Sequence, residues 1–564
     1  MYSLGIILFE MSFSLSTGME RVQTLARLRE EEHVLPAVFE EPEKSAQGDI
    51  IMSLVNHKPA ERPGSAELLR GGQIPVQIED DLIRTALRLL SDSKSSFRSQ
   101  LVSAIFSQAG TAQSDSAAFL RDQSYDAAVG PNFTSEDLLL QNMVKEKLAS
   151  VFRCHGAIEV SRHLLSPYSF YYSNHANAAV LMLDSSANLV QLPYDLTLPN
   201  ARTLAKRPHP GRKTFTFGEV YRESYSGGHP KAHGEVDFDI ISYDNLDLAL
   251  REAEVIKVID EVLDAFPSMG TVQMCYHVNH SRLLDAILTF CNIDPTKRTP
   301  VKETISRLNI GPWNWNKIRN ELRAPSIAVA ATSLDELMRF DFRDTFDKAI
   351  PKLRSILQET ADLETTFSHL HAVTVYLDRF NLKRKIYINP LSSYNEKFYR
   401  GNLLFQCLYD NKKRDVFAAG GRYDRLIHEH RPKSAKDDRH AVGFNLSWQG
   451  LCTSMTKYHK SVAKSKTKKR HVFDASWTLR RCDVLIDSFD LDILRTTGVK
   501  IAQELWANDI SAELVMDTDP DQTADYNQTS KDGKDVHSWI ILIKVRIACS
   551  SQSGYVCLRN SFST

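Results

Sequence analysis

The sequence predicts an α+β protein in which an antiparallel sheet carries helices, with a helical segment before it and a small α/β domain after it. Residues 214–222 and 236–240 alternate between apolar and polar side chains, as strands with two different faces do. Residues 1–11 are an apolar run typical of a buried helix. From Cys482 onward, apolar runs at strand length alternate with a helical pattern, which is typical of a small α/β domain.

Length and composition predict a soluble protein of several domains. The chain has 564 residues, too many for one hydrophobic core, and 42% of them are hydrophobic and 25% charged. The formal net charge of -1 excludes a strong overall field for nucleic acid, so any such surface must be local. Eight scattered cysteines without a CxxC pair argue against zinc sites and disulfides, and no apolar run approaches the roughly 20 residues of a membrane span. We therefore expect a cytoplasmic protein that binds no metal and no membrane.

The first part of the chain is expected to be helical. Residues 1–75 form one unit, and residues 76–129 form a connector in which apolar residues recur at helical spacing. Thr134 then offers a helix cap, with Asp137 three residues later, before a helix over 138–152.

The main domain, residues 130–456, mixes strands and helices. Apolar runs at 180–183 and 189–192 flank turn residues and predict a hairpin, and the next helix carries Pro199 near its start, where the missing N–H costs nothing. The remaining elements expected here are a long amphipathic helix over 246–266, a helical insertion near 290–370, and a hairpin formed by residues 403–409 and 416–419.

The C-terminal part is divided by its charge pattern. Residues 457–470 are rich in Lys and Arg, and they predict a basic linker over 457–475 whose simplest use is a solvated tether. Residues 476–547 form the α/β domain. Residues 548–564 fit no element, and we expect an irregular tail there.

The loop between the two alternating strands is the first candidate site. Residues 224–235 combine glycines with the cations Lys231 and His233, a composition suited to bending and to meeting an anion. Such a strand-loop-strand unit can hold a nucleotide or the end of a nucleic acid. From these residues alone, an ordinary hairpin with a solvated loop explains the pattern equally well.

Two blocks resemble a known family. The stretch 192–241, which opens Leu-Pro-Tyr-Asp-Leu-Thr, resembles motif 2 of class II aminoacyl-tRNA synthetases of the histidyl branch. The block Phe-Ala-Ala-Gly-Gly-Arg-Tyr-Asp at 417–424 is similar to the histidyl signature that holds histidine. The resemblance implies a class II synthetase-like fold with an anticodon-binding-like domain at 476–547. It also implies a homodimer through helix 138–152 and the following strand, although a core helix within one subunit is the alternative for those residues.

The resemblance also assigns candidate site residues. The positions expected to contact tRNA are Tyr221, Arg222, Lys231 and His233, and those expected to form a histidine-like pocket are Asp195, Gly420, Gly421, Arg422 and Tyr423. Stacking on an aromatic ring and cations on phosphates are the usual means of holding an RNA end. For Arg222 the structural alternative is an ion pair with Asp237 or Asp239, and for Arg422 it is an ion pair with Asp424.

Synthetase chemistry is not expected, because two of three catalytic cations are missing. Arg222 occupies the motif 2 position, but residues 388–399 lack the Arg-Gly-Leu-Asp-Tyr-Tyr signature of the histidyl branch. Gly450 stands where the motif 3 arginine belongs. Each cation would stabilise the leaving pyrophosphate, so losing two should slow adenylation by roughly a thousandfold or more.

The start of the chain resembles a second family. Residues 1–11 look like the large central helix of a protein-kinase C-lobe, and residues 55–63 look like its last signature. Combined with the histidyl blocks, they resemble the general-amino-acid-control kinases, which phosphorylate the alpha subunit of translation initiation factor 2. No glycine-rich loop, HRD or DFG element is present, so this chain is expected to have no kinase activity and no cofactor of its own; ATP and magnesium are expected for the intact kinase.

The resemblances together imply the regulatory half of such a kinase. The expected partners are uncharged tRNA and a second copy of the chain, with the ribosome as a further candidate and initiation factor 2 alpha as the substrate of the intact kinase. Two other functions stay open: an active histidyl-tRNA synthetase, and a dimerising scaffold that binds no RNA.

Overall fold

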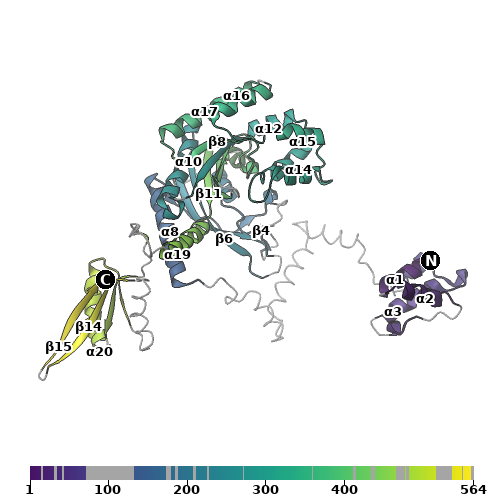
Figure 1. The fold of residues 1–564 in the computed structure, drawn as a ribbon, viewed down its shortest axis with the longest axis horizontal. Coiled ribbons are helices and arrows are strands. Elements are labelled where there is room, and N and C mark those ends of the chain that lie inside the picture. Colours follow the sequence, from purple (N-terminus) through teal and green to yellow (C-terminus); the bar gives the residue numbers. More distant parts are fainter. Residues whose placement is uncertain are drawn as a thin grey trace. The chain divides into compact units, whose positions relative to one another are not determined.

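The computed structural model divides the chain into two compact units, and each is described by itself (Figure 1). The described part of the first unit lies within residues 1–70, and that of the second begins at residue 133. The structure describes residues 1–13, 15, 17–30, 35–40, 44–70, 133–172, 179–184, 188–207, 211–224, 228–270, 272–358, 360–410, 415–432, 439–464, 477, 482–488, 490–515, 537–548 and 551–560. The connector expected at 76–129 lies outside these residues.

The first unit is helical, as the sequence predicts. Its elements are α1 (Tyr2–Ser12), α2 (Gly18–Leu28), η1 (Ala37–Glu40), α3 (Ser45–Val55), η2 (Pro59–Glu61) and α4 (Ser65–Arg70). Phe9 and Phe39 meet in a small core that also buries Leu28 and Val55. Arg62, in the segment that resembles the last kinase signature, donates from Nε to the carbonyl of Asn56 at 2.5 Å and from Nη2 to the carbonyl of His57 at 3.3 Å.

An eight-stranded sheet organises the second unit. The strands lie in the order β1-β5-β6-β11-β10-β9-β7-β8, and all neighbours are antiparallel except the parallel pairs β1–β5 and β7–β8 at the two edges. The strands are β1 (Ile158–Glu159), β5 (Lys213–Arg222), β6 (Lys231–Ser242), β7 (Met274–His280), β8 (Lys385–Ile388), β9 (Leu403–Tyr409), β10 (Val416–Arg422) and β11 (His440–Leu446). The two hairpins predicted within this sheet, β5–β6 and β9–β10, are confirmed, and so is the hairpin predicted from the apolar runs at 180–183 and 189–192, which lies outside it.

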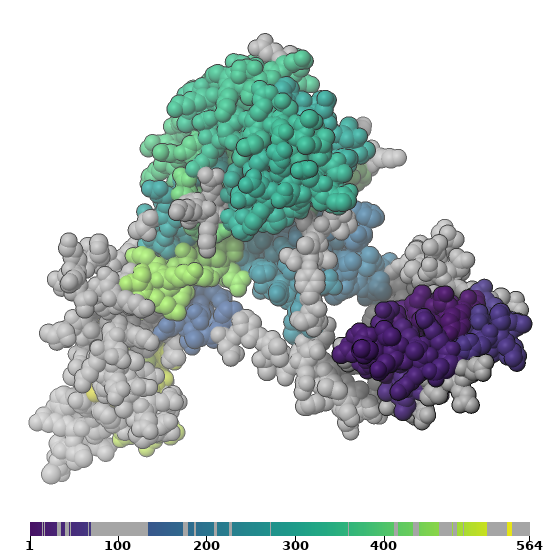
Figure 2. Space-filling view, turned by 45° about the vertical axis from the view of Figure 1, so that its right-hand side comes forward, coloured from purple at the N-terminus to yellow at the C-terminus, as the bar shows by residue number. Residues whose placement is uncertain are grey.

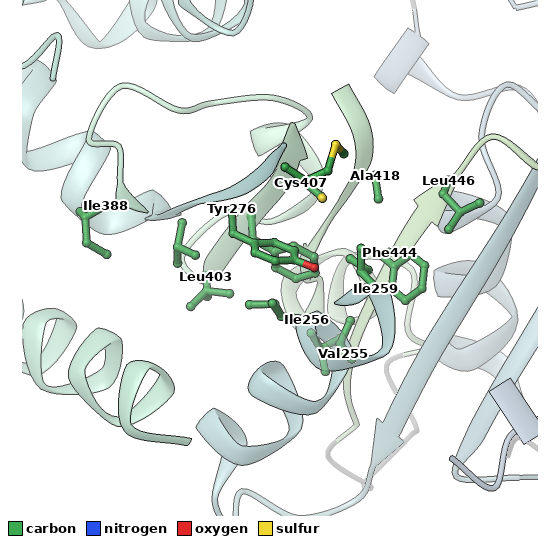
Figure 3. Close-up of a cluster of buried hydrophobic side chains, with 14 of the residues drawn as sticks. Val255, Ile256, Ile259, Tyr276, Ile388, Leu403, Cys407, Ala418, Phe444 and Leu446 are labelled. Atoms are coloured by element: carbon green, nitrogen blue, oxygen red, sulfur yellow. The ribbon is translucent and has the colours of Figure 1, made fainter. Parts of the chain in front are cut away.

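Helices α8 (Ser135–Cys154) and α10 (Leu248–Ala265) cover the apolar face of this sheet. The predicted cap of α8 is present as a reciprocal box, because the Asp137 amide donates to Thr134 Oγ1 at 3.2 Å and the Thr134 amide donates to Asp137 Oδ2 at 3.1 Å. Figure 3 shows residues of α10 beside the buried ring of Tyr276 from β7, in the cluster that also contains Cys407 from β9.

The ring of Phe152 at the end of α8 joins the helix to three strands. Its centroid lies 5.2 Å from Phe215 of β5 and 5.4 Å from Phe238 of β6, with Phe444 of β11 at 6.3 Å. All four rings are buried. The buried face of α8 is thus packed within one subunit, while Leu138 of the same helix is 49% exposed, so a dimer interface through this helix stays a prediction.

The segment near 290–370, expected as a helical insertion, is helical in the structure. After α12 (Ser281–Phe290) come α13 (Arg298–Ile305), α14 (Trp315–Arg323), α15 (Ala331–Met338), α16 (Phe346–Ile356) and α17 (Ala361–Arg379). These helices, drawn in teal and green, gather together and form one continuous surface of the second unit (Figures 1 and 2). Further elements around the sheet are η3 (Phe170–Tyr172), α9 (Thr197–Lys206), α11 (Pro267–Gly270), η4 (Pro295–Lys297), η5 (Glu396–Phe398), α18 (Asp424–Glu429) and α19 (Trp448–Lys464), with a small sheet of β2 (Ser166–Pro167), β4 (Leu189–Gln191) and β3 (Leu181–Leu183).

The C-terminal segment forms a second sheet in the order β13-β12-β14-β15. Its elements are β12 (Cys482–Ser488), α20 (Leu491–Ile493), η7 (Leu494–Gly498), α21 (Val499–Ala507), β13 (Ala512–Leu514), β14 (His537–Ala548) and β15 (Ser551–Asn560). The strand-helix-strand pattern predicted from Cys482 is confirmed.

Two expectations for this region need correction. The expected irregular tail contains β15, whose backbone pairs with β14 from Asn560 opposite Trp539 to Ser551 opposite Ala548, because an extended chain next to an open strand edge completes its hydrogen bonds there. The basic linker begins as helix, since α19 continues to Lys464; residues 465–475 of it lie outside the described residues.

The packing of Phe152 gives a test of the sheet–helix core. Phe152→Ala leaves a cavity between α8 and three strands, so we expect the second unit to lose about 3–5 kcal/mol of unfolding free energy. Near-UV circular dichroism during guanidinium unfolding measures the loss. Phe170→Ala is the matched control, because Phe170 is 82% exposed and its removal should change stability by at most about 0.5 kcal/mol. Equal midpoints for the two variants would contradict this account of the core.

Candidate nucleic-acid interface

The hairpin β5–β6 places four charged or titratable side chains on one face of the sheet. Arg222 lies opposite Lys231, Val220 opposite His233, and Gly218 opposite Glu235. Side chains opposite each other in an antiparallel pair share a face, so Arg222, Lys231, His233 and Glu235 stand together. Three of the four residues predicted to contact tRNA, Arg222, Lys231 and His233, therefore lie on the same face of the sheet.

Arg222 is held by the element that precedes the hairpin. Its guanidinium carbon lies 3.6 Å from the centroid of the Tyr194 ring, and Nη1 donates to the Tyr194 carbonyl at 2.6 Å. The amide of Tyr221 donates to the carbonyl of Pro193 at 2.7 Å, which fixes the two segments side by side. The block that opens motif 2 thus provides a platform for the arginine, with the guanidinium stacked on an aromatic face.

The ion pair considered as the structural alternative for Arg222 is formed by another residue. Arg162 Nη2 donates to Asp237 Oδ2 at 2.7 Å and to Asp239 Oδ2 at 3.1 Å. Arg162 follows the short edge strand β1, and no motif in the sequence pointed to it. The ion pair with Asp237 and Asp239 is therefore made by Arg162 and not by Arg222.

Tyr221 points away from its neighbour Arg222. Alternation along β5 puts it on the other face, and its hydroxyl donates to Glu219 Oε2 at 2.9 Å. Burial and that carboxylate raise the pKa of the Tyr221 hydroxyl to about 12. The tRNA contact predicted for Tyr221 would thus have to come from a different side of the hairpin than that of Arg222.

Glu235 is the site residue that sequence reasoning missed. Burial raises the pKa of its carboxyl to about 7, while Arg222 opposes the rise and Asp195 and Asp237 add to it. The buried Tyr394 hydroxyl belongs to the same group, and burial and Glu235 both raise its pKa. The signal for Glu235 was present in the hairpin register, because the pairing of residue 222 with residue 231 places residue 235 on the same face.

Asp195 is bound within the protein. Its Oδ2 accepts from the Tyr172 hydroxyl at 2.5 Å, and its Oδ1 accepts from the Leu198 amide at 2.7 Å at the start of α9. Burial raises the pKa of the Asp195 carboxyl, although both hydrogen bonds act against the rise. Burial also lowers the pKa of the nearby Lys397 amine, and Asp195 opposes that shift.

The two glycines predicted to approach a ligand face side chains of the protein instead. A Cβ on Gly421 would lie 2.6 Å from the Leu403 carbonyl and 2.7 Å from Cγ of Tyr399. A Cβ on Gly420 would lie 2.2 Å from the Gly443 carbonyl. Both glycines lie inside β10, where the chain needs them for close packing in the sheet.

Arg422 and Tyr423 also have internal partners, which differ from the expected histidine-like pocket. Arg422 is 2% exposed and donates from Nε to Glu252 Oε1 of α10 at 2.6 Å, while Asp424, the expected partner, lies 3.8 Å away. The Tyr423 hydroxyl donates to Asp239 Oδ1 at 2.6 Å. Arg422 and Tyr423 thus connect the end of β10 to α10 and β6, and their polar atoms are used within the protein.

The motif 3 position carries no cation. Gly450 lies in the first turn of α19, and its amide donates to Ser447 Oγ at 3.0 Å. An added Cβ would meet only Ser447, at 3.3 Å or more. Within the described residues, no cluster of three or more His, Cys, Asp or Glu side chains could hold a metal ion, and no helix is long and apolar enough to cross a membrane.

The fold and this polar sheet face define a class II synthetase-like protein. Solved structures with the same fold include an ATP phosphoribosyltransferase regulatory subunit/histidyl-tRNA synthetase from Bacillus halodurans C, with a TM-score of 0.55 and 16% identity over 74% of this chain and 97% of that one. A histidyl-tRNA synthetase from Nostoc sp. PCC 7120 has a TM-score of 0.54 and 14% identity, covering 76% of this chain and 97% of that one.

The chain belongs to the histidyl-tRNA synthetase family, whose model matches residues 135–451. A second model, described as the anticodon binding domain of tRNAs, matches residues 477–560 and so includes β15.

Similar curated proteins come from two groups. The eIF-2-alpha kinase GCN2 of Schizosaccharomyces pombe is 34% identical over 530 residues, which cover 92% of this chain and 33% of that protein, and the Homo sapiens kinase of the same name is 27% identical over 92% of this chain and 31% of that protein. The cytoplasmic histidine–tRNA ligase of Dictyostelium discoideum is 24% identical, over 75% of this chain and 84% of that protein. The chain therefore spans about a third of the length of the kinases it matches.

The raised pKa of Glu235 gives a pH prediction. A folded pKa of about 7 lies above the usual 4.5, so the folded state holds this proton more tightly than the unfolded chain does. The stability from protonated Glu235 is full below about pH 4.5 and is lost as the pH rises through 7. Glu235→Gln, which cannot ionise, should therefore lose less thermal stability than wild type between pH 5 and pH 8.

Differential scanning fluorimetry at the two pH values measures this difference. Glu219→Gln is the matched control, because Glu219 is an exposed carboxylate on the same hairpin and its variant should keep the wild-type pH dependence. An identical drop in melting temperature for wild type and Glu235→Gln would refute the assignment.

Proposed function

We propose that this chain is the regulatory, uncharged-tRNA-binding region of a serine/threonine kinase that phosphorylates translation initiation factor 2 alpha. Membership of the histidyl-tRNA synthetase family, the matched anticodon-binding model and the similarity to eIF-2-alpha kinases along 92% of the chain support the proposal. In the intact kinase, uncharged tRNA that accumulates during amino-acid starvation would bind here and release the kinase from inhibition.

The observation that carries the proposal is the setting of Arg222. Its guanidinium is stacked on Tyr194 and shares a sheet face with the exposed residues Lys231 and His233. A stacking platform beside cations suits the phosphates and bases at the end of an RNA chain. Burial, Arg222 and Lys231 all lower the pKa of the His233 ring, so His233 offers a neutral ring near pH 7 and the positive charge at this place comes from Arg222 and Lys231.

Amino-acid adenylation is the rival use of the same site, and two features disfavour it. Gly450 leaves the motif 3 position without charge, and the Arg-Gly-Leu-Asp-Tyr-Tyr signature is missing from residues 388–399, where Tyr394 lies among Glu235, Tyr194 and Arg222. A site with one of three cations would bind an RNA end better than it would stabilise a leaving pyrophosphate.

The wider proposal concerns the intact kinase. ATP and magnesium would serve its catalytic domain, and initiation factor 2 alpha would be its substrate. We also propose a cytoplasmic location, with the ribosome as a further partner, because translation takes place there.

Dimerisation belongs to the same proposal. Large apolar side chains are exposed in the segment that follows α8, namely Ile158 on β1 (54%), Leu165 just before β2 (48%) and Leu183 on β3 (50%). Large apolar side chains left exposed can mark a surface that a protein partner covers. A second copy of the chain is the occupant we propose.

The tRNA proposal predicts a specific loss of affinity. Arg222→Ala removes a phosphate-binding cation and should weaken uncharged tRNA by about 1–3 kcal/mol. Lys231→Ala should weaken binding less, and in wild type the affinity should fall as salt rises, because cations displace counterions from RNA. Gly450→Arg should leave the affinity nearly unchanged. Titration of fluorescently labelled tRNA at two salt concentrations measures all of these.

The control is Arg339→Ala, since Arg339 is an exposed arginine in the helical insertion that pairs with Glu336 at 2.6 Å. Wild-type affinity in a correctly folded Arg222→Ala protein would rule out motif 2 as the RNA site. ATP–pyrophosphate exchange above background would favour the active synthetase, and no tRNA binding by any form would favour the scaffold.

The dimer proposal predicts a doubled mass in solution. Light scattering at micromolar concentration should give about twice 63.9 kDa for the wild-type chain. Leu183→Glu should shift the protein toward the monomer, because it buries a charge in the interface. Met338→Glu changes an equally exposed apolar residue of the helical insertion and should leave the mass unchanged. A monomeric wild type would contradict the proposal.

A further inference from the structure

A cavity of about 340 Å³ lies at one end of four adjacent sheet strands. β7 ends at His280 opposite the start of β9 at Leu403, and β10 ends at Arg422 beside the start of β11. The segments that leave or enter the strands at this end line the cavity, namely the start of α12, residues 400–402, α18 with the turn after it, and residue 439. None of the side chains around Arg222 lines it.

Five arginines line this cavity, and they come from distant parts of the sequence. They are Arg282, Arg400, Arg425, Arg431 and Arg439. Only the fold brings them together, because nothing in their local sequence marks them as a group. We call them the arginine pocket.

Negative charge among the described residues does not balance the arginine pocket. Asp424 is the one carboxylate among the lining residues, and it is directed to β11, where it accepts from His440 Nδ1 at 2.7 Å and from the Ala441 amide at 2.9 Å. Glu429, close by on α18, pairs with Arg425 at 3.0 Å. Five positive and two negative charges leave an excess of three positive charges at the cavity.

Arg431 has hydrogen-bonding capacity that the protein leaves unused. Its Nη2 atom is buried and has no hydrogen-bond partner. A guanidinium does not lose its proton in a protein, so this N–H cannot be neutralised and needs an acceptor. Arg282 is exposed, and among the described residues its side chain has no hydrogen-bond acceptor either. The pocket therefore offers donors to a ligand that carries several acceptor oxygens.

We propose that the arginine pocket binds a ligand that carries two or more phosphate groups close together along one chain. Guanidinium groups fit phosphate oxygens with paired hydrogen bonds, and a multiply charged anion is needed to offset the excess charge. The volume is in the range of small-ligand pockets. Two sources share this chemistry, the polyphosphate chain of a free nucleotide and the backbone of an RNA strand. The proposal does not depend on tRNA binding at Arg222.

Isothermal titration of the full chain with inorganic triphosphate, in low-salt buffer without magnesium, tests the proposal. We expect one site per chain. Arg431→Gln and Arg282→Gln should each weaken triphosphate binding about tenfold or more, because each removes a charged hydrogen-bond donor. Arg282 is exposed, so its variant tests the pocket without altering a buried group. Arg339→Gln, remote from the pocket along the chain, is the matched control and should bind as wild type does.

Competition distinguishes the two sources of phosphate. Displacement of triphosphate by a 5′-phosphorylated single-stranded tetranucleotide of RNA would identify the backbone of an RNA strand as the ligand, and displacement by ATP alone would identify a free nucleotide. Less than a twofold change in both arginine variants, with unaltered melting temperatures, would overturn the proposal. A loss of binding in Arg222→Ala but not in the pocket variants would also overturn it, because the anion would then occupy the motif 2 site.

Discussion

One buried cation, Arg162, holds the polar face of the sheet together. Asp237 and Asp239 are two residues apart on β6, so both carboxylates point to this face, and both are at most 3% exposed. Two buried carboxylates repel each other, and burial together with Asp237 raises the pKa of Asp239. Arg162 donates to both of them and also to Asn200 Oδ1 at 2.7 Å. Asn200 and Tyr423 also donate hydrogen bonds to Asp239. The Asp239 carboxylate on β6 therefore connects α9 with the residue that follows β10.

The same face changes character along β6. Toward the inside of the sheet it carries the buried pair Asp237 and Asp239, and toward the hairpin loop it carries Glu235, then His233 and Lys231, which are exposed. The carboxylates of the acidic end share the guanidinium of Arg162, whereas the basic end faces outward beside Arg222. A structural network and a ligand surface can therefore share one strand without competing for partners.

Positive charge is organised in two different ways on this domain. The cations near Arg222 come from one hairpin and stand in an open row. The arginine pocket draws its cations from segments as far apart in the chain as Arg282 and Arg439 and places them around a cavity, because antiparallel neighbours bring the end of one strand to the beginning of the next. The near-zero net charge of the chain hides both features, since acidic residues elsewhere compensate them.

The sequence alone determined most of the secondary structure and pointed to the family of this protein. The cap at Thr134 and Asp137, the two hairpins and the insertion follow from local periodicity and turn chemistry, which neighbouring residues fix. The tertiary structure decided which candidate residues remain available. Arg422, Tyr423 and the glycines of β10 read as a ligand pocket in the sequence but are occupied by Glu252, Asp239 and Tyr399, which come from other segments. Arg162 and Arg431 carried no local signal, because their partners and the charge balance around them arise only when distant segments meet. Glu235 could have been placed from the hairpin register, but its burial depends on the rest of the fold.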